Sequence, residues 1–489
     1  MRLGRLAAAA GIALDSDPDR QVTGFAIDHR KVAPGTVFGA FRGASFNGED
    51  FIPAAVAAGA VAVVARPEVR VEGALHIADA EPRRAFARLA AGFFAPVPPT
   101  IVAVTGTNGK TSTVEMTRQL WRMAGERAAS IGTLGVTTSD ESVSTGLTTP
   151  DIVTFLSNMS GLAREGITHV AYEASSHGLS QYRNEGLRVS AAAFTNFSRD
   201  HLDYHGTMEE YFAAKMRLID EVVADDATLV AWTGAGEWAG RAIEHARRRQ
   251  LRVLTVGEQG EDIRLLAHRP TQLGQDLTIA HDGAERTVRL PLIGAYQVAN
   301  ALVAAGLVIA TGGAAQATFD ALGRLQPVRG RLERAAIAPG GAPVYVDYAH
   351  TPDALEAAIA ALRPHVNGRL IAVFGAGGDR DEGKRAAMGR VAADKADVVI
   401  VTDDNPRGED PAAIRRAVLE GAPGAREIGD RRAAIAEAIA MAGAHDIVLV
   451  AGKGHEQGQI IGSGETMRVL PFDDVAVARE CAGSGRDRP

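Results

Sequence analysis

A glycine-rich segment that ends in a lysine and a threonine, Gly106-Thr107-Asn108-Gly109-Lys110-Thr111, follows the apolar run Ile101 to Thr105. Glycines let backbone N–H groups approach an oxyanion, and the N-terminus of a following helix adds positive potential. Lys110 supplies a mobile cation, and the Thr111 hydroxyl can ligate Mg²⁺. The pattern G-x-x-x-x-G-K-[ST] would need a glycine at Val104, so only its second half is matched. The segment predicts a site for a nucleoside triphosphate; a glycine turn without a ligand is the alternative.

A carboxylate and an imidazole follow two further strand-like runs. Glu173 ends the run that begins at His169, and His201 comes shortly after the run Ala191 to Thr195. Ligands of open α/β sheets bind beyond the carboxyl ends of the strands, and Mg²⁺ prefers hard ligands. Glu173, His201 and Thr111 are therefore candidate Mg²⁺ ligands. For His201 alone, a helix-capping or hydrogen-bonding role is the alternative.

These segments belong to a recurring pattern of a short apolar run, a polar or glycine-rich turn and an alanine-rich, helix-like stretch. The alternation predicts an α/β fold with parallel sheets. The opening residues 1–14 predict an amphipathic first helix rather than a signal peptide. The clearest strands are expected at residues 101–105, 169–172, 191–195, 344–347, 370–374, 397–402 and 447–451.

The chain of 489 residues is too long for one hydrophobic core of ordinary size. The proline-rich stretch Ala95 to Pro99 and a break at Gln326 to Gly330 suggest boundaries between domains. We therefore expect three domains, at residues 1–97, 98–327 and 328–489.

Composition excludes several classes of protein. A net charge of -7 gives no basic surface for nucleic acid, and the single cysteine, Cys481, excludes an intramolecular disulfide and a cysteine-rich zinc site. No apolar stretch reaches the roughly 20 residues that a membrane-spanning helix needs. The sequence predicts a cytoplasmic protein without a membrane span, and a monomer.

The GTNGKT segment after a VAVT strand resembles the Mur ligase and folylpolyglutamate synthase superfamily. Further motifs along essentially the whole chain are similar to the MurE type of the Mur ligase family, which adds the third amino acid of the cell-wall peptide. The resemblance implies a UDP-binding N-terminal domain, a central ATPase domain with a phosphate loop and a parallel sheet, and a Rossmann-like C-terminal domain. The matching motifs are residues 148–150, 173–179, 181, 183, 196–205, 214–215, 330–333, 347–353, 377–381, 404–407 and 452–456.

The resemblance also implies that ATP is a co-substrate and Mg²⁺ a cofactor. It places Asn300 near the adenine and Arg331 and Asp347 near the ribose and phosphates, in addition to Gly106 to Thr111. It assigns catalytic roles to Lys110, Lys215 and Arg331, and metal binding to Glu173 and His201. Lys215 is the lysine that becomes N6-carboxylysine in similar enzymes, which requires a neutral amine and hence a lowered pKa. A plain surface lysine on a helix from Glu209 to Leu218 is the alternative.

The acceptor implied by the resemblance is UDP-N-acetylmuramoyl-L-alanyl-D-glutamate. Its uridine diphosphate would be contacted by Ile27, Asp28, His29 and the turn Gly43 to Phe46. His29 stands where the family usually has serine, so a hydroxyl contact is missing. The muramyl dipeptide would be lined by Thr148, Thr149, Ser175, Gln181, Arg183 and the carboxylated Lys215.

Asp404-Asn405-Pro406-Arg407 follows the strand-like run at 397–402 and would choose the added amino acid. An arginine fork suits bidentate carboxylate binding, and meso-2,6-diaminopimelate has a second carboxylate that lysine lacks. In the family the DNPR form accompanies diaminopimelate. Arg380, Gly452 and Glu456 would complete the pocket, with Glu456 facing an ammonium group. An Asn-Pro turn with a solvated arginine is the alternative.

The reaction implied is transfer of the ATP γ-phosphoryl group to the D-glutamyl γ-carboxylate, followed by attack of a diaminopimelate amine on the acyl phosphate. Two other functions remain open at this point. One is a sister ligase, such as folylpolyglutamate synthase or another Mur enzyme, with a different acceptor. The other is a nucleotide-switched binding protein that makes no product, which would have no need of Glu173, His201 and Lys215 together.

Overall fold

A computed structural model of the chain describes residues 1–14, 18–43, 47–139, 142–143, 148–271, 273–379 and 382–483, without the side chains of Asp203 and Glu465. These residues pack as two compact units. The first consists of Met1–Arg264 with Leu302–Thr318, and the second of Leu265–Ala301 with Phe319–Pro489. The predicted domain boundaries at 97/98 and 327/328 remain predictions.

The chain begins with a four-stranded parallel sheet in the order β1-β2-β3-β4. Its strands are β1 (Gly24–Ala26), β2 (Thr36–Gly39), β3 (Ala60–Ala65) and β4 (Leu75–Ala78), and its helices are α1 (Leu3–Ala10), α2 (Ile52–Ala57) and α3 (Pro82–Phe93). Leu3 and Leu6 of α1 are buried in one cluster with Phe86 and Leu89 of α3. The predicted amphipathic first helix is therefore confirmed.

A second sheet supplies the main scaffold of the first unit. Its central strand β5 (Thr100–Thr105) lies between β9 (His169–Glu173) and β10 (Val189–Phe194), and all three run parallel. Parallel strands β11 (Val223–Trp232) and β12 (Arg252–Gly257) continue beyond β10. Beyond β9 lie β6 (Ala128–Gly132), β7 (Gly135–Thr137) and β8 (Ser142–Val143), of which the last two are antiparallel additions. The carboxyl ends of β9, β5 and β10 therefore share one edge.

The helices of this part connect the parallel strands, as the alternation predicts. They are α4 (Lys110–Met123), α5 (Ile152–Arg164), α6 (Ser176–Ser180), α7 (Leu202–His205), α8 (Met208–Arg217) and α9 (Glu237–Arg248). The chain then forms β13 (Ile263–Thr271), the antiparallel hairpin of β14 (Gly274–His281) and β15 (Ala284–Leu290), and helices α10 (Ala295–Ala310) and α11 (Ala315–Leu322).

The second unit contains a six-stranded sheet in the order β16-β17-β21-β18-β19-β20. Only the edge strand β16 (Glu333–Ile337) is antiparallel; the others are β17 (Pro343–Asp347), β21 (Ile447–Ala451), β18 (Leu370–Phe374), β19 (Val398–Val401) and β20 (Arg426–Glu427). A hairpin of β22 (Gly458–Ile461) and β23 (Arg468–Pro471) follows β21.

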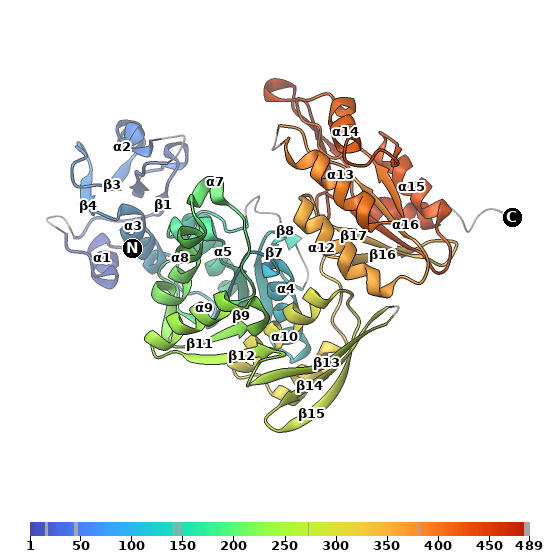
Figure 1. Cartoon of the computed structure of the whole chain (residues 1–489). Helices are drawn as coiled ribbons and strands as arrows, with labels where there is room; N and C mark the ends of the chain where they lie inside the picture. The colour runs from blue at the N-terminus through green and yellow to red at the C-terminus, as the bar shows by residue number, and fades with distance from the viewer. Residues whose placement is uncertain are drawn as a thin grey trace. The chain divides into compact units, whose positions relative to one another are not determined.

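Helices cover both faces of this sheet (Figure 1). Side chains alternate between the faces of a strand, so Leu370 and Phe374 belong to one core and Ile371 and Val373 to the other. The first core includes residues of α12 (Pro352–Leu362), α13 (Lys384–Lys395) and α14 (Pro411–Leu419), and the second includes residues of α15 (Arg431–Met441) and α16 (Asp474–Gly483).

The α/β fold and all seven predicted strands are confirmed, as β5, β9, β10, β17, β18, β19 and β21. The antiparallel strands at the sheet edges are the main addition to the expected parallel pattern. Among the helices that the structure describes, none is long and apolar enough to cross a membrane.

Candidate active site

The segment Gly106 to Lys110 forms a tight loop from β5 into α4. Gly106 and Gly109 have φ of 142° and 84°, which side chains other than glycine rarely adopt. A Cβ on Gly106 would lie 2.1 Å from Thr195 Oγ1, so the loop also needs glycine for space. The loop therefore presents backbone N–H groups at the start of a helix, as an oxyanion site requires.

Residues that follow β10 clamp this loop. The Asn108 N–H donates to Asn196 Oδ1 at 2.8 Å, and Thr195 Oγ1 donates to the Asn108 carbonyl at 2.6 Å. The Ser198 N–H donates to Thr107 Oγ1 at 3.0 Å. These contacts fix the shape of the loop.

Two lysines meet at one carbonyl of the loop. Lys110 Nζ donates to the carbonyls of Gly106 at 2.9 Å and Thr107 at 2.8 Å, and Lys215 Nζ donates to Gly106 at 2.7 Å. Lys215 comes from α8, whose first turn is fixed by a capping box of Thr207 and Glu210. The structure thus brings the two predicted catalytic lysines together.

Lys215 is only 1% exposed, and its Nζ lies 4.4 Å from the centre of the Tyr211 ring. Burial, and then the positive charge of Lys110, hold the pKa of Lys215 well below its ordinary value. Both effects favour the neutral amine. Lys215 is therefore not the surface lysine of the alternative interpretation.

Glu173 lies at the carboxyl end of β9, paired with Val104 of β5. It is 2% exposed, and its carboxylate accepts hydrogen bonds from the backbone N–H of Thr133 at 2.7 Å and from Thr133 Oγ1 at 3.3 Å. Gly132 leaves the space for it, since a Cβ there would lie 2.2 Å from Glu173 Oε1. Glu173 is thus held beside the phosphate loop.

His201 reaches the same edge from β10, on the other side of β5. It has a φ of 52° and begins α7, and its ring lies 4.9 Å from that of His177 and 5.9 Å from that of Tyr211. Thr111 is buried in the first turn of α4. The described residues contain no group of three His, Cys, Asp or Glu side chains arranged for a metal ion.

The residues predicted for the muramyl dipeptide, apart from Lys215, form one hydrogen-bonded network next to Glu173. Thr149 Oγ1 donates to the Glu173 carbonyl at 2.8 Å and shares a hydrogen bond of 2.9 Å with Ser175 Oγ. Arg183 donates to the Thr149 carbonyl at 2.7 Å and to Gln181 Oε1 at 2.7 Å. Thr148 joins through Thr133, whose hydroxyl lies 3.1 Å from Thr148 Oγ1.

The residues predicted for the uridine diphosphate follow β1. Ile27 is 36% exposed, and the His29 ring stacks on Phe51 with centroids 4.4 Å apart and planes 2° from parallel. His29 thus forms an aromatic pair with Phe51. Of the predicted turn Gly43 to Phe46, residues 44–46 lie outside the described residues.

Three residues predicted for the nucleotide come together within the second unit. Gln297 links two of them, because it accepts from Asn300 Nδ2 at 3.2 Å and donates to the Arg331 carbonyl at 3.0 Å. Asp347 accepts from the N–H of Leu332 at 2.8 Å. Burial raises the pKa of Asp347, and the charge of Arg331 opposes that shift.

A cavity of about 310 Å³ lies at the carboxyl ends of β17, β18, β19 and β21. It combines two cations, Lys384 and Arg407, with two carboxylates, Asp404 and Glu456. Such a mixed lining suits a zwitterionic amino acid. The cavity is lined by Tyr348, His350, Gly377, Lys384, Asp404, Asn405, Arg407, Gly452 and Glu456.

The DNPR segment is held from both sides. Arg407 has a φ of 52°; its N–H donates to the Ile460 carbonyl at 3.0 Å and its Nη1 to the Gly378 carbonyl at 2.9 Å. Asn405 donates to Glu456 Oε2 at 2.8 Å and accepts from the fully buried Lys453 at 2.8 Å. The structure thus unites Asp404 to Arg407 with Gly452 and Glu456, and Pro406 is buried among them. Arg380 lies outside the described residues.

A fully buried ion pair, Arg431 with Asp474, lies next to the backbone segments that line this cavity. Arg431 and Asp474 are both 0% exposed and bond through Nε–Oδ1 and Nη2–Oδ2, each at 2.7 Å. Arg431 also donates to the carbonyls of Asp403 at 3.2 Å and Ala451 at 2.9 Å. The pair therefore fixes the two backbone segments that precede Asp404 and Gly452.

We expect Asp474→Ala to destabilise the protein by about 3–5 kcal/mol, because it leaves the guanidinium of Arg431 buried and unpaired. The shift of the urea unfolding midpoint measures this loss. Arg432→Ala is the control, since the ion pair of Arg432 with Glu480 is more than half exposed and its loss should change little. Equal midpoints for Asp474→Ala and the parent protein would contradict the role given to the pair.

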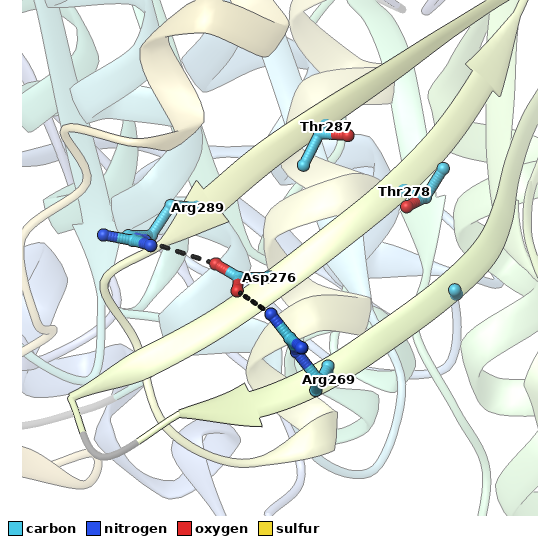
Figure 2. Close-up of a pocket in the computed structure, with 6 residues that line it drawn as sticks. Arg269, Asp276, Thr278, Thr287 and Arg289 are labelled. Atoms are coloured by element: carbon cyan, nitrogen blue, oxygen red, sulfur yellow. Dashed lines mark hydrogen bonds and ion pairs between the residues drawn. The ribbon is translucent and has the colours of Figure 1, made fainter.

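A larger hollow of about 580 Å³ lies on the strands β13, β14 and β15. Figure 2 shows Arg269 and Arg289 pointing toward Asp276 from either side. Both arginines are 80% exposed, and exposed ion pairs of this kind contribute little to stability. None of the predicted site residues lines this hollow, which is an open strand surface rather than a substrate pocket.

Sequence reasoning left several of these contacts without a role. Thr195 ends the predicted strand and Asn196 follows it, but their hydrogen bonds to Asn108 depend on β10 lying next to β5. Lys453 lies within the matching motif at residues 452–456, whereas Lys384 lies outside every matching motif. Knowledge of the strand order would have indicated the contacts of Thr195 and Asn196 with Asn108. No local signal in the sequence marks Lys384 as a residue of the cavity.

Comparison with known proteins adds to this geometry. Three family models match the chain: "Mur ligase family, catalytic domain" at residues 21–94, "Mur ligase middle domain" at 104–308 and "Mur ligase, glutamate ligase domain" at 330–454. A UDP-N-acetylmuramoyl-L-alanyl-D-glutamate--2,6-diaminopimelate ligase of Zymomonas mobilis is 62% identical over 479 residues, 98% of each chain. The chain belongs to the Mur ligase family.

Other relatives and solved structures are similar to this Mur ligase in sequence and in fold. A ligase of the same name from Bradyrhizobium diazoefficiens is 52% identical over 93% of each chain. A solved structure of a ligase of that name matches with a TM-score of 0.75 at 33% identity, over 100% of both chains. Folylpolyglutamate synthase from Mycobacterium tuberculosis shares the fold, with a TM-score of 0.62 at 19% identity over 84% of this Mur ligase and 96% of that chain.

Proposed function

We propose that this Mur ligase uses ATP to add meso-2,6-diaminopimelate to UDP-N-acetylmuramoyl-L-alanyl-D-glutamate, in the synthesis of the cell-wall precursor. The observation that carries the proposal is the cavity that is lined by Arg407 and Lys384 together with Asp404 and Glu456. The names of the 62% and 52% identical relatives support the same reaction. A monomer that works in the cytoplasm remains a prediction from the sequence.

In the first half-reaction an oxygen of the D-glutamyl γ-carboxylate attacks the γ-phosphorus of ATP, and ADP leaves with the electrons of the broken P–O bond. Gly106 to Thr111 would hold the phosphates, and Lys110 would leave the loop carbonyls to follow the moving charge. Arg331 would add a second positive charge. Asn300 and Asp347 would hold the adenosine.

A magnesium ion fits the donor set at this edge. The buried carboxylate of Glu173, the imidazole of His201 and the hydroxyl of Thr111 come from the strands and helix around the phosphate loop. Mg²⁺ that is bound to ATP typically has only a few protein ligands. When bound, the ion would neutralise phosphate charge.

We propose that Lys215 is carboxylated. Its neutral amine would attack CO₂, form an N–C bond and release one proton, which leaves a carbamate in place of a cation. Burial and the neighbouring Lys110 favour the neutral amine, and the carbamate would then bring a negative charge beside Lys110.

In the second half-reaction an amine of diaminopimelate attacks the acyl carbon, and phosphate leaves from the tetrahedral intermediate. The cavity would orient the amino acid through Arg407 on one carboxylate and through Glu456 on an ammonium group. Thr149, Ser175, Gln181 and Arg183 would hold the dipeptide, and Ile27 and His29 the uridine end.

Release of ADP tests this order of steps. We expect steady ADP formation only when ATP, acceptor and diaminopimelate are all present, because the acyl phosphate is consumed by the amine. Omission of the acceptor should leave only background hydrolysis. Equal ADP formation without acceptor would contradict a ligase and favour a nucleotide-switched protein.

We expect Arg407→Ala to lower kcat/KM for diaminopimelate by at least about 10²-fold, because the distal carboxylate loses a charge-assisted bond. The KM for ATP should stay unchanged, and the preference over lysine should narrow. Kinetics with each amino acid in turn measure both effects. Arg416→Ala, at a largely exposed arginine of α14, is the control and should change neither value. An intact preference in Arg407→Ala would refute this role for Arg407.

A further inference from the structure

Helix α3 of the N-terminal sheet is docked on the loop that carries Gln181 and Arg183. The Tyr182 hydroxyl donates to Glu81, which stands immediately before the helix. Arg84 Nε donates to Glu185 Oε1 at 3.0 Å, and Arg88 Nε donates to the same oxygen at 3.1 Å. The first turn of α3 is therefore fixed against residues 182–185, within the first compact unit.

Arg83 lies in this docked turn, between Glu81 and Arg84. Its Nη2 donates to the Arg42 carbonyl at 3.0 Å, and its guanidinium lies 4.9 Å from the centre of the Phe41 ring. Both partners are uncharged groups. Among the described residues, no carboxylate lies within ion-pair distance of Arg83.

Arg183, on the other side of the contact between α3 and the loop, likewise bonds only to neutral groups in the part of the chain that the structure describes. It is half-buried and donates to neutral oxygens of Thr149 and Gln181. The Gln181 amide also donates to the Tyr204 hydroxyl at 3.2 Å. Burial lowers the pKa of Arg183, and the charge of Asp151, which lies beyond ion-pair distance, opposes that shift only in part.

The bonds of Glu81 to Tyr182 and of Arg84 to Glu185 bring Arg83, which lies between Glu81 and Arg84, to the loop that carries Arg183. Burial, and then the positive charge of Arg183, lower the pKa of Arg83. Partly buried cations without an anion between them are unfavourable, and paired arginines are well suited to bind phosphate or carboxylate. The neighbouring Thr149 belongs to the network beside Glu173.

We propose that Arg83 binds an anionic group of the acceptor together with Arg183, and so joins the N-terminal sheet to the central sheet through the substrate. This inference rests on the proposed function, because the anion is taken to be part of the acceptor. A phosphate of the nucleotide and a carboxylate of the peptide share the required chemistry. Neither the sequence motifs nor the family models assign a role to Arg83.

The test is calorimetric binding of UDP-N-acetylmuramoyl-L-alanyl-D-glutamate to the full chain. We expect Arg83→Gln to raise its Kd by about tenfold or more, as for other hydrogen bonds to charged groups. Arg83→Lys should recover part of the affinity, and the KM for ATP should not change. Binding of UDP alone identifies the anion: its Kd rises with that of the acceptor if a phosphate is bound, and stays constant if a carboxylate is bound.

Arg88→Gln is the matched control, because Arg88 docks the same helix on Glu185 and is exposed. It separates docking of the helix from binding of the anion, and thermal unfolding of each variant verifies the fold. An acceptor Kd that Arg83→Gln leaves unchanged, or that Arg88→Gln raises equally, overturns the inference. Failure of the unaltered protein to bind the acceptor would instead overturn the proposed function.

Discussion

Lys110→Ala is expected to lower the turnover number for product formation by at least about 10³-fold, the largest effect of any single change proposed. Lys110 Nζ donates to two carbonyls of the phosphate loop, and we propose that it is the cation that follows the γ-phosphoryl group. Without it, negative charge that develops on the γ-phosphoryl group has no lysine partner. Quenched-flow measurement of acyl phosphate and ADP would locate the loss in the first half-reaction.

Lys395→Ala serves as the control for this change, since Lys395 pairs with Glu356 on the surface of the second unit. Its turnover number should match that of the parent protein. If Lys110→Ala also keeps the parental turnover number, the assignment of Gly106 to Thr111 as the phosphate site is wrong.

Lys215→Ala is expected to be nearly inactive, with partial rescue by added short-chain carboxylic acids. The side chain is fully buried beside Lys110, so a carbamate there would supply a negative oxygen that alanine cannot. A small acid can enter the space that the lysine leaves and restore this oxygen. Initial rates at increasing acetate or propionate concentration measure the rescue.

Because carbamates are lost in acid, carboxylation has to be observed in the intact protein. NMR after incubation with ¹³C-bicarbonate does this. A carbamate carbon signal should appear in the parent protein and be absent from Lys215→Ala. A crystal structure with ATP and acceptor bound that still shows an unmodified Lys215 amine on the Gly106 carbonyl would refute this proposal.

Local signals in the sequence predicted the parts of the site that a few adjacent residues determine. The loop Gly106 to Thr111 follows a buried strand directly, and Asp404 to Arg407 follows another. Both lie at carboxyl strand ends in the structure, as parallel sheets require. The predicted helix from Glu209 to Leu218 is α8, at Met208–Arg217.

Other features depend on contacts between distant residues and had no local signal. Arg431 and Asp474 are 43 residues apart, and Arg84 and Glu185 are 101 apart. The antiparallel hairpin of β14 and β15 was not predicted, although its turn at Asp282-Gly283, with φ of 48° and 75°, is a common hairpin signal. The alanine-rich α/β alternation on which the prediction rested is a pattern that does not include an antiparallel hairpin.

The most direct test of the proposed function is the mass of the product that the purified protein forms from ATP and UDP-N-acetylmuramoyl-L-alanyl-D-glutamate, with diaminopimelate and lysine offered in separate reactions. We predict a product heavier by one diaminopimelate residue, formed at least about 10²-fold more efficiently than the lysine product. A product formed preferentially with lysine, or ADP release without any new amide, would contradict the account.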